Sequence, residues 1–264
     1  TRIPQACPGC QSKELKDLGE GTQRVETTVQ ALLPSATILR IDRDSTRNKG
    51  QLEAHLDEVK SGHADVVVGT QLLTKGHDFD HLSLVGVLDA DQGLYSSDFR
   101  STENLFQQLV QVAGRAGRRD KQGRVLVQTR FTDHPLFEFV VTQDYQGFAN
   151  AELEMRQQLG LPPFGYLAMF RAESTHDARA MQFLRALKTQ LPVFDGVRVM
   201  DAVAAPMAKR AGRYRAQLLI QAQSRGALHT CLMSFIERLE RHEGMRKLAG
   251  SVRWSLDVDP QDLY

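Results

Sequence analysis

This chain of 264 residues contains no apolar run that is long enough to cross a membrane. A transmembrane helix needs about 20 consecutive, mainly apolar residues. The first residues also lack the order of a secretory leader, in which positive charges precede an apolar stretch. We therefore expect a cytoplasmic protein that has no membrane partner.

Cysteine is scarce, and neither sign of charge is in excess. The 3 cysteines argue against a disulfide framework, and Cys231, alone in a helical pattern, is expected to be a small core residue. The formal net charge is +1, so any surface that binds nucleic acid must be local. Hydrophobic content of 41% and charged content of 25% are typical of a soluble globular protein, and the length suits two domains.

The N-terminus carries half of a metal site. Cys7 and Cys10 form a CxxC knuckle, which supplies two thiolates where tetrahedral zinc takes four ligands. A redox CxxC is the alternative, but such a motif normally opens a helix after a strand, and nothing here precedes it. We favour a third interpretation, in which residues 1–18 are the remnant of a Zn²⁺ module whose other ligands lie upstream.

Short β-type runs alternate with helical patterns from Gly19 to about Arg130. The predicted strands are 36–41, 65–69, 84–88 and 124–129, and the predicted helices are 52–59 and 102–113. Near-continuous apolar strands separated by helices predict an α/β fold, with a parallel sheet that helices cover on both faces. Functional sites in such sheets lie at the carboxyl ends of the strands.

Two arginines three residues apart stand at the end of Gln-Val-Ala-Gly-Arg-Ala-Gly-Arg, residues 111–118. Arg115 and Arg118 each follow a glycine, so two always-ionised guanidinium groups can be aimed at one phosphate. The alternative is a helix that ends in an exposed Gly/Arg turn. The stretch resembles the last helicase motif of superfamily 2 ATPases. By that resemblance, both arginines reach the γ-phosphate, Gln111 is a further catalytic residue, and Gly114 lies beside the nucleotide.

A second motif ends the predicted strand 65–69. The Gly69-Thr70 turn presents a hydroxyl and backbone N–H groups that can hold a phosphate, although such a pair is often only a turn and helix cap. It precedes Gln111 by about 40 residues, and this order and spacing resemble helicase motifs V and VI on one RecA-like lobe. By that resemblance Gly69 and Thr70 contact the DNA backbone, while Gly76 and Asp78 lie beside the nucleotide and couple it to strand movement.

Three further stretches indicate which helicase family the chain resembles. They are Gly19-Glu20-Gly21-Thr22-Gln23-Arg24-Val25-Glu26, Arg40-Ile41-Asp42-Arg43-Asp44, and Leu88–Tyr95 running into Ser97–Glu103. Together with a cysteine module just before the lobe, they resemble the PriA family of primosomal helicases over nearly the whole chain. DEAD-box RNA helicases usually have His in place of Gln111, and RecG-like helicases lack the cysteine module. Gln23 is a departure, since the family commonly has Glu there.

The resemblance implies that residues 19–160 form the second RecA-like lobe of an ATP-dependent 3′-5′ DNA helicase. Such a helicase recognises stalled or abandoned replication forks and starts primosome assembly. A G-x-x-x-x-G-K-[ST] loop is absent here. The loop and the site for ATP with Mg²⁺ would lie upstream, and this part alone is expected to be inactive. The implied partners are single-stranded and branched DNA, single-stranded-DNA-binding protein and other primosome proteins.

Beyond Arg130 the pattern changes. Residues 135–159 are predicted helical, and the paired prolines after them end the helix, so we place the second domain at 161–264. There the predicted strands are 167–172, 197–204, 214–221 and 252–258, and the predicted helices are 175–191 and 225–243. This order is that of a ferredoxin-like α+β domain, a topology that hosts many functions.

Basic residues gather in the middle of this second domain. Lys209, Arg210, Arg213 and Arg215 surround a glycine-containing turn, together with one aromatic residue, and can follow a DNA backbone. The alternative is a solvated hairpin. By the family resemblance, Arg213 and Gln217 are candidate contacts for the tail of single-stranded-DNA-binding protein. Two other functions stay open: a non-catalytic module that binds single-stranded DNA and a partner, or a lobe of a RecG-like helicase.

Overall fold

The computed structural model describes residues 21–42, 45–46, 50–70, 82–96, 98–114 and 123–263. Contacts divide these residues into two compact units. The first unit contains the described residues up to Gln92 together with Leu105–Asp133, and the second contains Gly93–Asn104 and the chain from His134 onward. The domain boundary that we placed after residue 160 stays a prediction.

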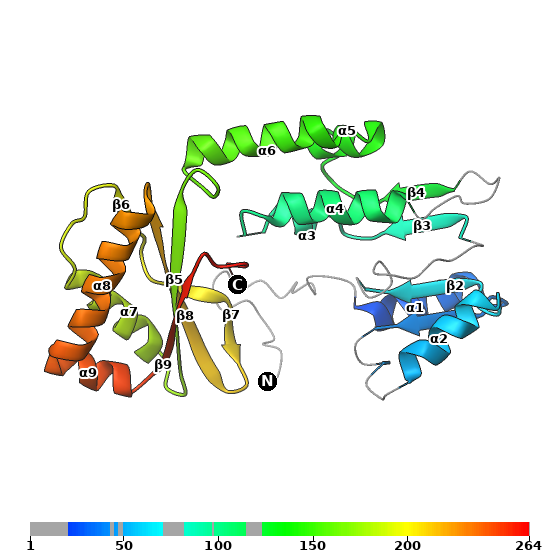
Figure 1. The fold of residues 1–264 in the computed structure, drawn as a ribbon. Helices are drawn as coiled ribbons and strands as arrows, with labels where there is room; N and C mark the ends of the chain where they lie inside the picture. The colour runs from blue at the N-terminus through cyan, green and yellow to red at the C-terminus, as the bar shows by residue number, and fades with distance from the viewer. Residues whose placement is uncertain are drawn as a thin grey trace. The chain divides into compact units, whose positions relative to one another are not determined.

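The first unit begins with a parallel strand pair and two helices (Figure 1). The elements are α1 (Thr22–Leu32), β1 (Ile38–Ile41), α2 (Gln51–Lys60) and β2 (Val66–Gly69). In the register of the pair, Ile38 lies opposite Val66 and Ile41 opposite Gly69. Both helices contact β1, and Ile41 is fully buried. The apolar strand runs of the sequence therefore provide the core of this pair.

A second parallel pair completes the first unit. Its strands are β3 (Leu84–Val87) and β4 (Arg124–Val127). Between them lie α3 (Asp91–Leu94) and α4 (Ser101–Ala113), of which residues 93–94 and 101–104 belong to the second unit. Val87 lies opposite Val127, and among the described residues β1–β2 and β3–β4 are two separate sheets. The mixed α/β character is confirmed, while one continuous RecA-like sheet stays a prediction.

Two helices follow where the sequence predicts one helical stretch. They are α5 (Pro135–Thr142) and α6 (Tyr145–Leu159). Gln143 ends α5 with a left-handed φ of 56°, and the Asp144 carboxylate starts α6 by accepting a 2.8 Å hydrogen bond from the Gly147 N–H. Asp is a preferred N-cap because it satisfies an unpaired N–H of the first turn. The break therefore has a local cause that apolar spacing alone does not reveal.

A five-stranded antiparallel sheet forms the centre of the second unit. Its strands are β5 (Tyr166–Ser174), β6 (Val197–Val199), β7 (Val203–Arg210), β8 (Arg213–Ala222) and β9 (Arg253–Val258). The order is β6-β8-β5-β9, and β7 also pairs with β8. The helices are α7 (Arg179–Thr189), α8 (Arg225–Arg241) and α9 (Glu243–Gly250), and Figure 1 shows α7 and α8 over one face of the sheet.

The core of this unit lies between the sheet and these helices. Phe170, Phe183 and Phe235 are completely buried, with the rings of Phe170 and Phe235 4.8 Å apart. Cys231 belongs to the same cluster, and burial raises the pKa of its thiol to about 11, as expected for a core cysteine. Side chains alternate along a strand. Residues of β5 and β8 next to a core position therefore point to the face of the sheet opposite this core. That second face carries Arg171 and several other arginines.

The basic segment in this unit is mostly strand. The predicted strand 197–204 is divided between β6 and β7, and β7 runs on through Lys209 and Arg210. Only Ala211 and Gly212 form the turn, with φ values of 48° and 77°. Positive φ at both central positions matches the twist of a two-residue hairpin, so the basic side chains stand on a hairpin, whose register shifts between Ala204 and Lys209.

Candidate functional site

The carboxyl ends of β1 and β2 lie side by side. Ile41 and Gly69 are register partners at these ends, and both Gly69 and Thr70 are exposed, directly after the buried Val68. The parallel pair thus presents the Gly69-Thr70 turn at the edge where α/β sheets hold ligands. Gly76 and Asp78 lie outside the described residues.

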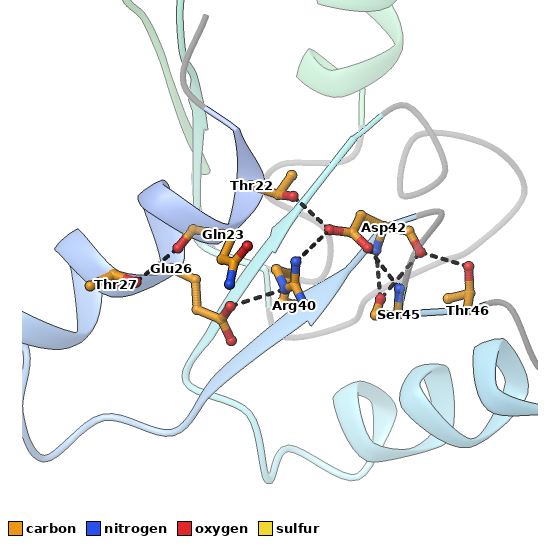
Figure 2. A network of polar contacts seen from close by, with 8 residues as sticks. All are labelled: Thr22, Gln23, Glu26, Thr27, Arg40, Asp42, Ser45 and Thr46. Atoms are coloured by element: carbon orange, nitrogen blue, oxygen red, sulfur yellow. Dashed lines mark hydrogen bonds and ion pairs between the residues drawn. The ribbon is translucent and has the colours of Figure 1, made fainter. Parts of the chain in front are cut away.

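A buried carboxylate stands at the same edge (Figure 2). Asp42 is only 7% exposed, and its Oδ2 accepts a 2.6 Å hydrogen bond from the Thr22 hydroxyl and a 3.0 Å bond from Arg40. Its Oδ1 accepts from the Ser45 N–H at 2.8 Å. Arg40 also pairs with Glu26 of α1 at 3.0 Å. Asp42 therefore ties the start of α1 and the loop after β1 to the strand end.

The second parallel pair ends in a similar carboxylate. Asp91 follows β3, is 8% exposed, and accepts a 2.6 Å hydrogen bond from the Thr129 hydroxyl beyond β4. It also accepts bonds from the backbone N–H and the Nε of Arg130, each at 3.2 Å. The hydrogen bond from Thr129, followed by the contacts with Arg130, lowers the pKa of Asp91. Asp91 thus stays ionised at neutral pH and joins the two strand ends.

Sequence reasoning missed the roles of Asp42 and Asp91. From the sequence alone, both residues are only members of stretches that resemble a helicase family. The available signal was an acidic residue directly after an apolar strand run, because a carboxylate that becomes buried at such a place must find hydrogen-bond donors.

Helix α4 presents one apolar and one polar face. Its buried residues are Leu105, Phe106, Leu109 and Val112, while Gln111 and the following Gly114 are exposed. Gln111 and Gly114 of the predicted phosphate motif are therefore accessible. Arg115 and Arg118 lie outside the described residues, and their role stays a prediction.

The basic hairpin of the second unit places its charges on two faces. Lys209 pairs with Tyr214 and its Nζ lies 3.1 Å from the phenol oxygen. Arg213 and Arg215 project from the face opposite the helices, and Arg213 lies 3.7 Å from Glu173. Within the part of the chain that the structure describes, the side chains of Arg210 and Arg215 have no acidic partner. These two guanidinium groups form no ion pair among the described residues, while Glu173 lies opposite Arg215 in the β5–β8 register and Asp262 lines a hollow together with both arginines.

A hollow of about 290 Å³ opens beside Arg215 on the same face of the sheet. Arg171, Gln217 and Arg253 also line it. Gln217 donates a 3.2 Å hydrogen bond to the carbonyl of Leu263, and its Oε1 is buried without a partner in the described structure. Gln217 and Arg213 thus share one face of β8, but Gln217 is already engaged by the closing residues of the chain.

The described residues contain neither a metal-binding cluster nor a membrane-spanning helix. Cys7 and Cys10 lie outside them, and the described histidines, cysteines and acidic residues form no group of three that could hold a metal ion. Over the same ranges, none of the helices has the length and hydropathy to span a bilayer.

Two family models match this chain. The helicase conserved C-terminal domain matches residues 18–120, and the primosomal protein N C-terminal domain matches residues 157–261. The chain thus combines a helicase C-terminal domain with a separate, β-rich C-terminal domain.

Curated relatives match almost the full chain. The replication restart protein PriA of Haemophilus influenzae is 41% identical over 264 residues, which is 99% of this chain and 35% of the relative. The PriA proteins of Bacillus subtilis and Synechocystis are 36% and 38% identical, over 98% and 97% of this chain and 32% and 30% of their own lengths. The chain therefore spans about a third of the length of these relatives. On these matches, the chain belongs to the PriA family of replication restart proteins.

Proposed function

We propose that this chain is the C-terminal part of an ATP-dependent 3′-5′ DNA helicase that recognises stalled or abandoned replication forks and starts primosome assembly. The observation that carries the proposal is the presence of both domain matches in one chain, whose relatives are named replication restart proteins. Neither a RecG-like lobe nor a DEAD-box lobe accounts for the primosomal match at residues 157–261.

In this proposal residues 19–160 form the second RecA-like lobe of the motor. Gly69 and Thr70 contact the DNA backbone, which their exposed position at a strand end supports. Gly76, Asp78 and Gly114 lie beside the nucleotide, and Gln111, Arg115 and Arg118 form the catalytic motif. ATP with Mg²⁺ is held mainly by residues outside this chain, because the chain has no G-x-x-x-x-G-K-[ST] loop. The contribution of this lobe is positive charge directed at the transferring phosphoryl group.

The second domain serves recognition in the same proposal. The strand order β6-β8-β5-β9, with α7 and α8 on one face, supports a ferredoxin-like fold. Lys209, Arg210, Arg213 and Arg215 contact single-stranded or branched DNA, and Arg213 with Gln217 contacts single-stranded-DNA-binding protein. Other primosome proteins complete the set of partners, and the protein acts in the cytoplasm.

Zinc is part of the proposal for the full-length protein. Cys7 and Cys10 have the chemistry and spacing for two of the four thiolate or imidazole ligands that structural zinc takes. A Zn²⁺ ion there would fix the fold of its own module, and the remaining ligands would come from residues outside this chain.

The proposal is tested by Arg118→Ala in the full-length protein. Loss of an arginine that stabilises the transferring phosphoryl group costs on the order of 10³–10⁵ in rate, so DNA-stimulated ATP hydrolysis should disappear while DNA binding is retained. Arg124→Ala, an exposed arginine at the start of β4, is the matched control and should keep hydrolysis. Hydrolysis that survives Arg118→Ala contradicts the proposal.

A non-catalytic DNA- and partner-binding module is the second candidate function. It is favoured by one specific observation, the two guanidinium groups of Arg210 and Arg215 that lack acidic partners among the described residues. The two candidates differ in their requirement for residues 111–118, since a binding module needs only the hairpin.

A further inference from the structure

The second face of the antiparallel sheet, opposite the helices, carries arginines on two neighbouring strands of the second unit. Arg171 of β5 is the register partner of Gln217 of β8, and Arg215 lies two residues from Gln217 on the same face. Diagonal neighbours of this kind are about 7–8 Å apart, within the reach of long side chains. The guanidinium groups of Arg171 and Arg215 can therefore approach one ligand together.

The closing residues 259–263 form a strap against this face, and the strap is held by its backbone. Nη2 of Arg171 donates a 2.7 Å hydrogen bond to the carbonyl of Asp262, and Gln217 donates to the carbonyl of Leu263 at 3.2 Å. Leu263 is only 7% exposed. These contacts use backbone groups of the strap, so they do not depend on the carboxylate of Asp262.

The Asp262 carboxylate itself is loosely held. Its Oδ1 lies 3.3 Å from Nη2 of Arg171, and the Asp262 side chain is 62% exposed. Arg171 also has a second carboxylate partner, because its Nη1 donates to Oδ2 of Asp257 on β9. Ion pairs exposed to solvent contribute little stability. An anion from solution can therefore replace the Asp262 carboxylate while Asp257 and the strap backbone stay in place.

Asp262 also lies beside the two arginines of the basic hairpin that form no ion pair among the described residues. It lines a hollow of about 480 Å³ together with Arg210 and Arg215, and with Pro206 and Met207. A guanidinium group binds carboxylates and phosphates through the same fork of N–H donors. The apolar Pro206 and the exposed Met207 suit the sugar and base of a nucleotide better than they suit a bare, hydrated phosphate.

The other carboxylate beside Arg215 is engaged elsewhere. Glu173 lies opposite Arg215 in the register. Its Oε1, however, lies 3.7 Å from Nε of Arg213 and 3.8 Å from Nη1 of Arg253. Asp262 is therefore the carboxylate that competes with a phosphate for the arginines around the hollow.

We infer that Arg171, Arg210 and Arg215 form a phosphate site for single-stranded DNA on the second face, and that Asp262 keeps this site partly closed. A DNA phosphate enters by taking the guanidinium contact of the Asp262 carboxylate, which turns to water. The inference rests on the proposed function, because it extends the DNA contact of the basic hairpin to Arg171 on β5.

The test measures how tightly the full-length protein binds a fluorescent oligo-dT strand. Asp262→Asn removes the competing charge and keeps the shape, so the affinity should rise by about threefold at about 0.1 M salt, the effect of one exposed, screened charge. Asp259→Asn is the matched control, because it removes the same charge from an exposed position of the same strap. Asparagine tolerates the left-handed φ of 54° at that position, and the affinity should stay near that of the parent.

A second variant tests the arginine directly. Arg171→Gln should lower the slope of log K against log salt by about 0.7, the value for one phosphate contact on a single strand. Combined with Asp262→Asn, it should cancel the gain in affinity. Glutamine retains an amide nitrogen that can donate to the Asp262 carbonyl, so the strap keeps a partner there.

Two further probes identify the ligand. The inference is overturned if Asp262→Asn strengthens binding of a hexa-aspartate peptide but not of oligo-dT, because the partner is then an acidic protein segment. It is also overturned if replacing chloride by phosphate at equal ionic strength abolishes the gain, because a small phosphate then fills the site.

The controls separate this inference from the proposed function. If Asp262→Asn behaves as Asp259→Asn does, or if Arg171→Gln leaves the salt slope unchanged, the inference alone is overturned. An unchanged slope after Arg210→Gln together with Arg215→Gln would instead overturn the proposed DNA contact of the hairpin itself.

Discussion

Asp91 shows how one side chain can connect two strand ends. Its carboxylate accepts bonds from Thr129 and Arg130, which follow β4, while Asp91 itself follows β3. These donors favour the ionised form, so the pKa of Asp91 lies below its ordinary value. A group whose pKa is lowered by folding contributes stability above its unfolded pKa, and this contribution is lost as the pH falls through the folded pKa.

Thr129→Val should therefore have an effect that depends on pH. It removes the hydroxyl that contributes most to the lowered pKa, so the pKa of Asp91 should rise toward its ordinary value near 4. The variant should unfold at a lower temperature than the parent at pH 7, and the difference should shrink as the pH falls below the ordinary pKa of an aspartate and through the lowered pKa of Asp91 in the parent. Thermal unfolding followed by circular dichroism at pH 7 and pH 3 measures this. Thr129→Ser retains the hydroxyl and should behave as the parent, and a difference that persists unchanged at pH 3 would contradict the explanation.

At the scale of elements, the β7–β8 hairpin determines which basic residues act together. Side-chain alternation places Arg213 and Arg215 on one face of β8, with Arg210 opposite Arg213 in the register. Lys209 is the register partner of Tyr214 instead, and its Nζ lies 4.4 Å from the centre of that ring. The sequence predicted one basic cluster, and the hairpin register divides it.

The salt dependence of DNA binding should follow this division. Changing Arg210 and Arg215 together to Gln removes two free charges, so the slope of log K against log salt for single-stranded DNA should fall by about 1.4, at about 0.7 for each phosphate contact. Titration of a fluorescent oligonucleotide at several salt concentrations measures the slope. The matched control is Arg238→Gln with Arg241→Gln, two basic residues in the last turn of α8, which should leave the slope as it is. An unchanged slope in the hairpin variant would exclude these two arginines as backbone contacts.

At the scale of the whole molecule, the two compact units have separate cores. Phe170 lies in the cluster between the antiparallel sheet and its helices, whereas Ile41 is fully buried in the β1–β2 pair of the first unit. The family matches divide the sequence in a similar manner, at residues 18–120 and 157–261. Separate cores predict separate cooperative transitions, for which one unfolding temperature is not a defined quantity.

Calorimetry of the chain should resolve these transitions. Phe170→Ala removes a fully buried ring at a cost of about 3–5 kcal/mol and should lower the transition of the second unit only. Ile41→Ala, at about 2–5 kcal/mol, should lower only that of the first unit. If either substitution shifts both transitions equally, the units unfold as one body.

Local chemistry determined much of this protein directly from the sequence. The apolar runs at 65–69 and 84–88 predicted β2 and β3, because continuous apolar runs of this length are typical of strands in parallel sheets, although Leu84 at the start of β3 is exposed. The motif around Gln111 and the stretch 97–103 predicted the family, which the matches confirm. Cys231 was expected in a core because it stands alone in a helical pattern, and it is buried there.

Only the tertiary structure decided which distant residues meet. No spacing in the sequence places Leu263 on Asp98 or Arg156 on Glu103, because such contacts depend on the path of the chain between them. The division of the basic residues between two faces likewise depends on the register of β7 with β8. The sequence thus determined the elements, the motifs and the family, since these follow from local pattern. Tertiary packing decided the carboxylate networks and the contacts of Leu263 with Asp98 and of Arg156 with Glu103, since hydrogen bonds between distant segments exist only once the chain is folded.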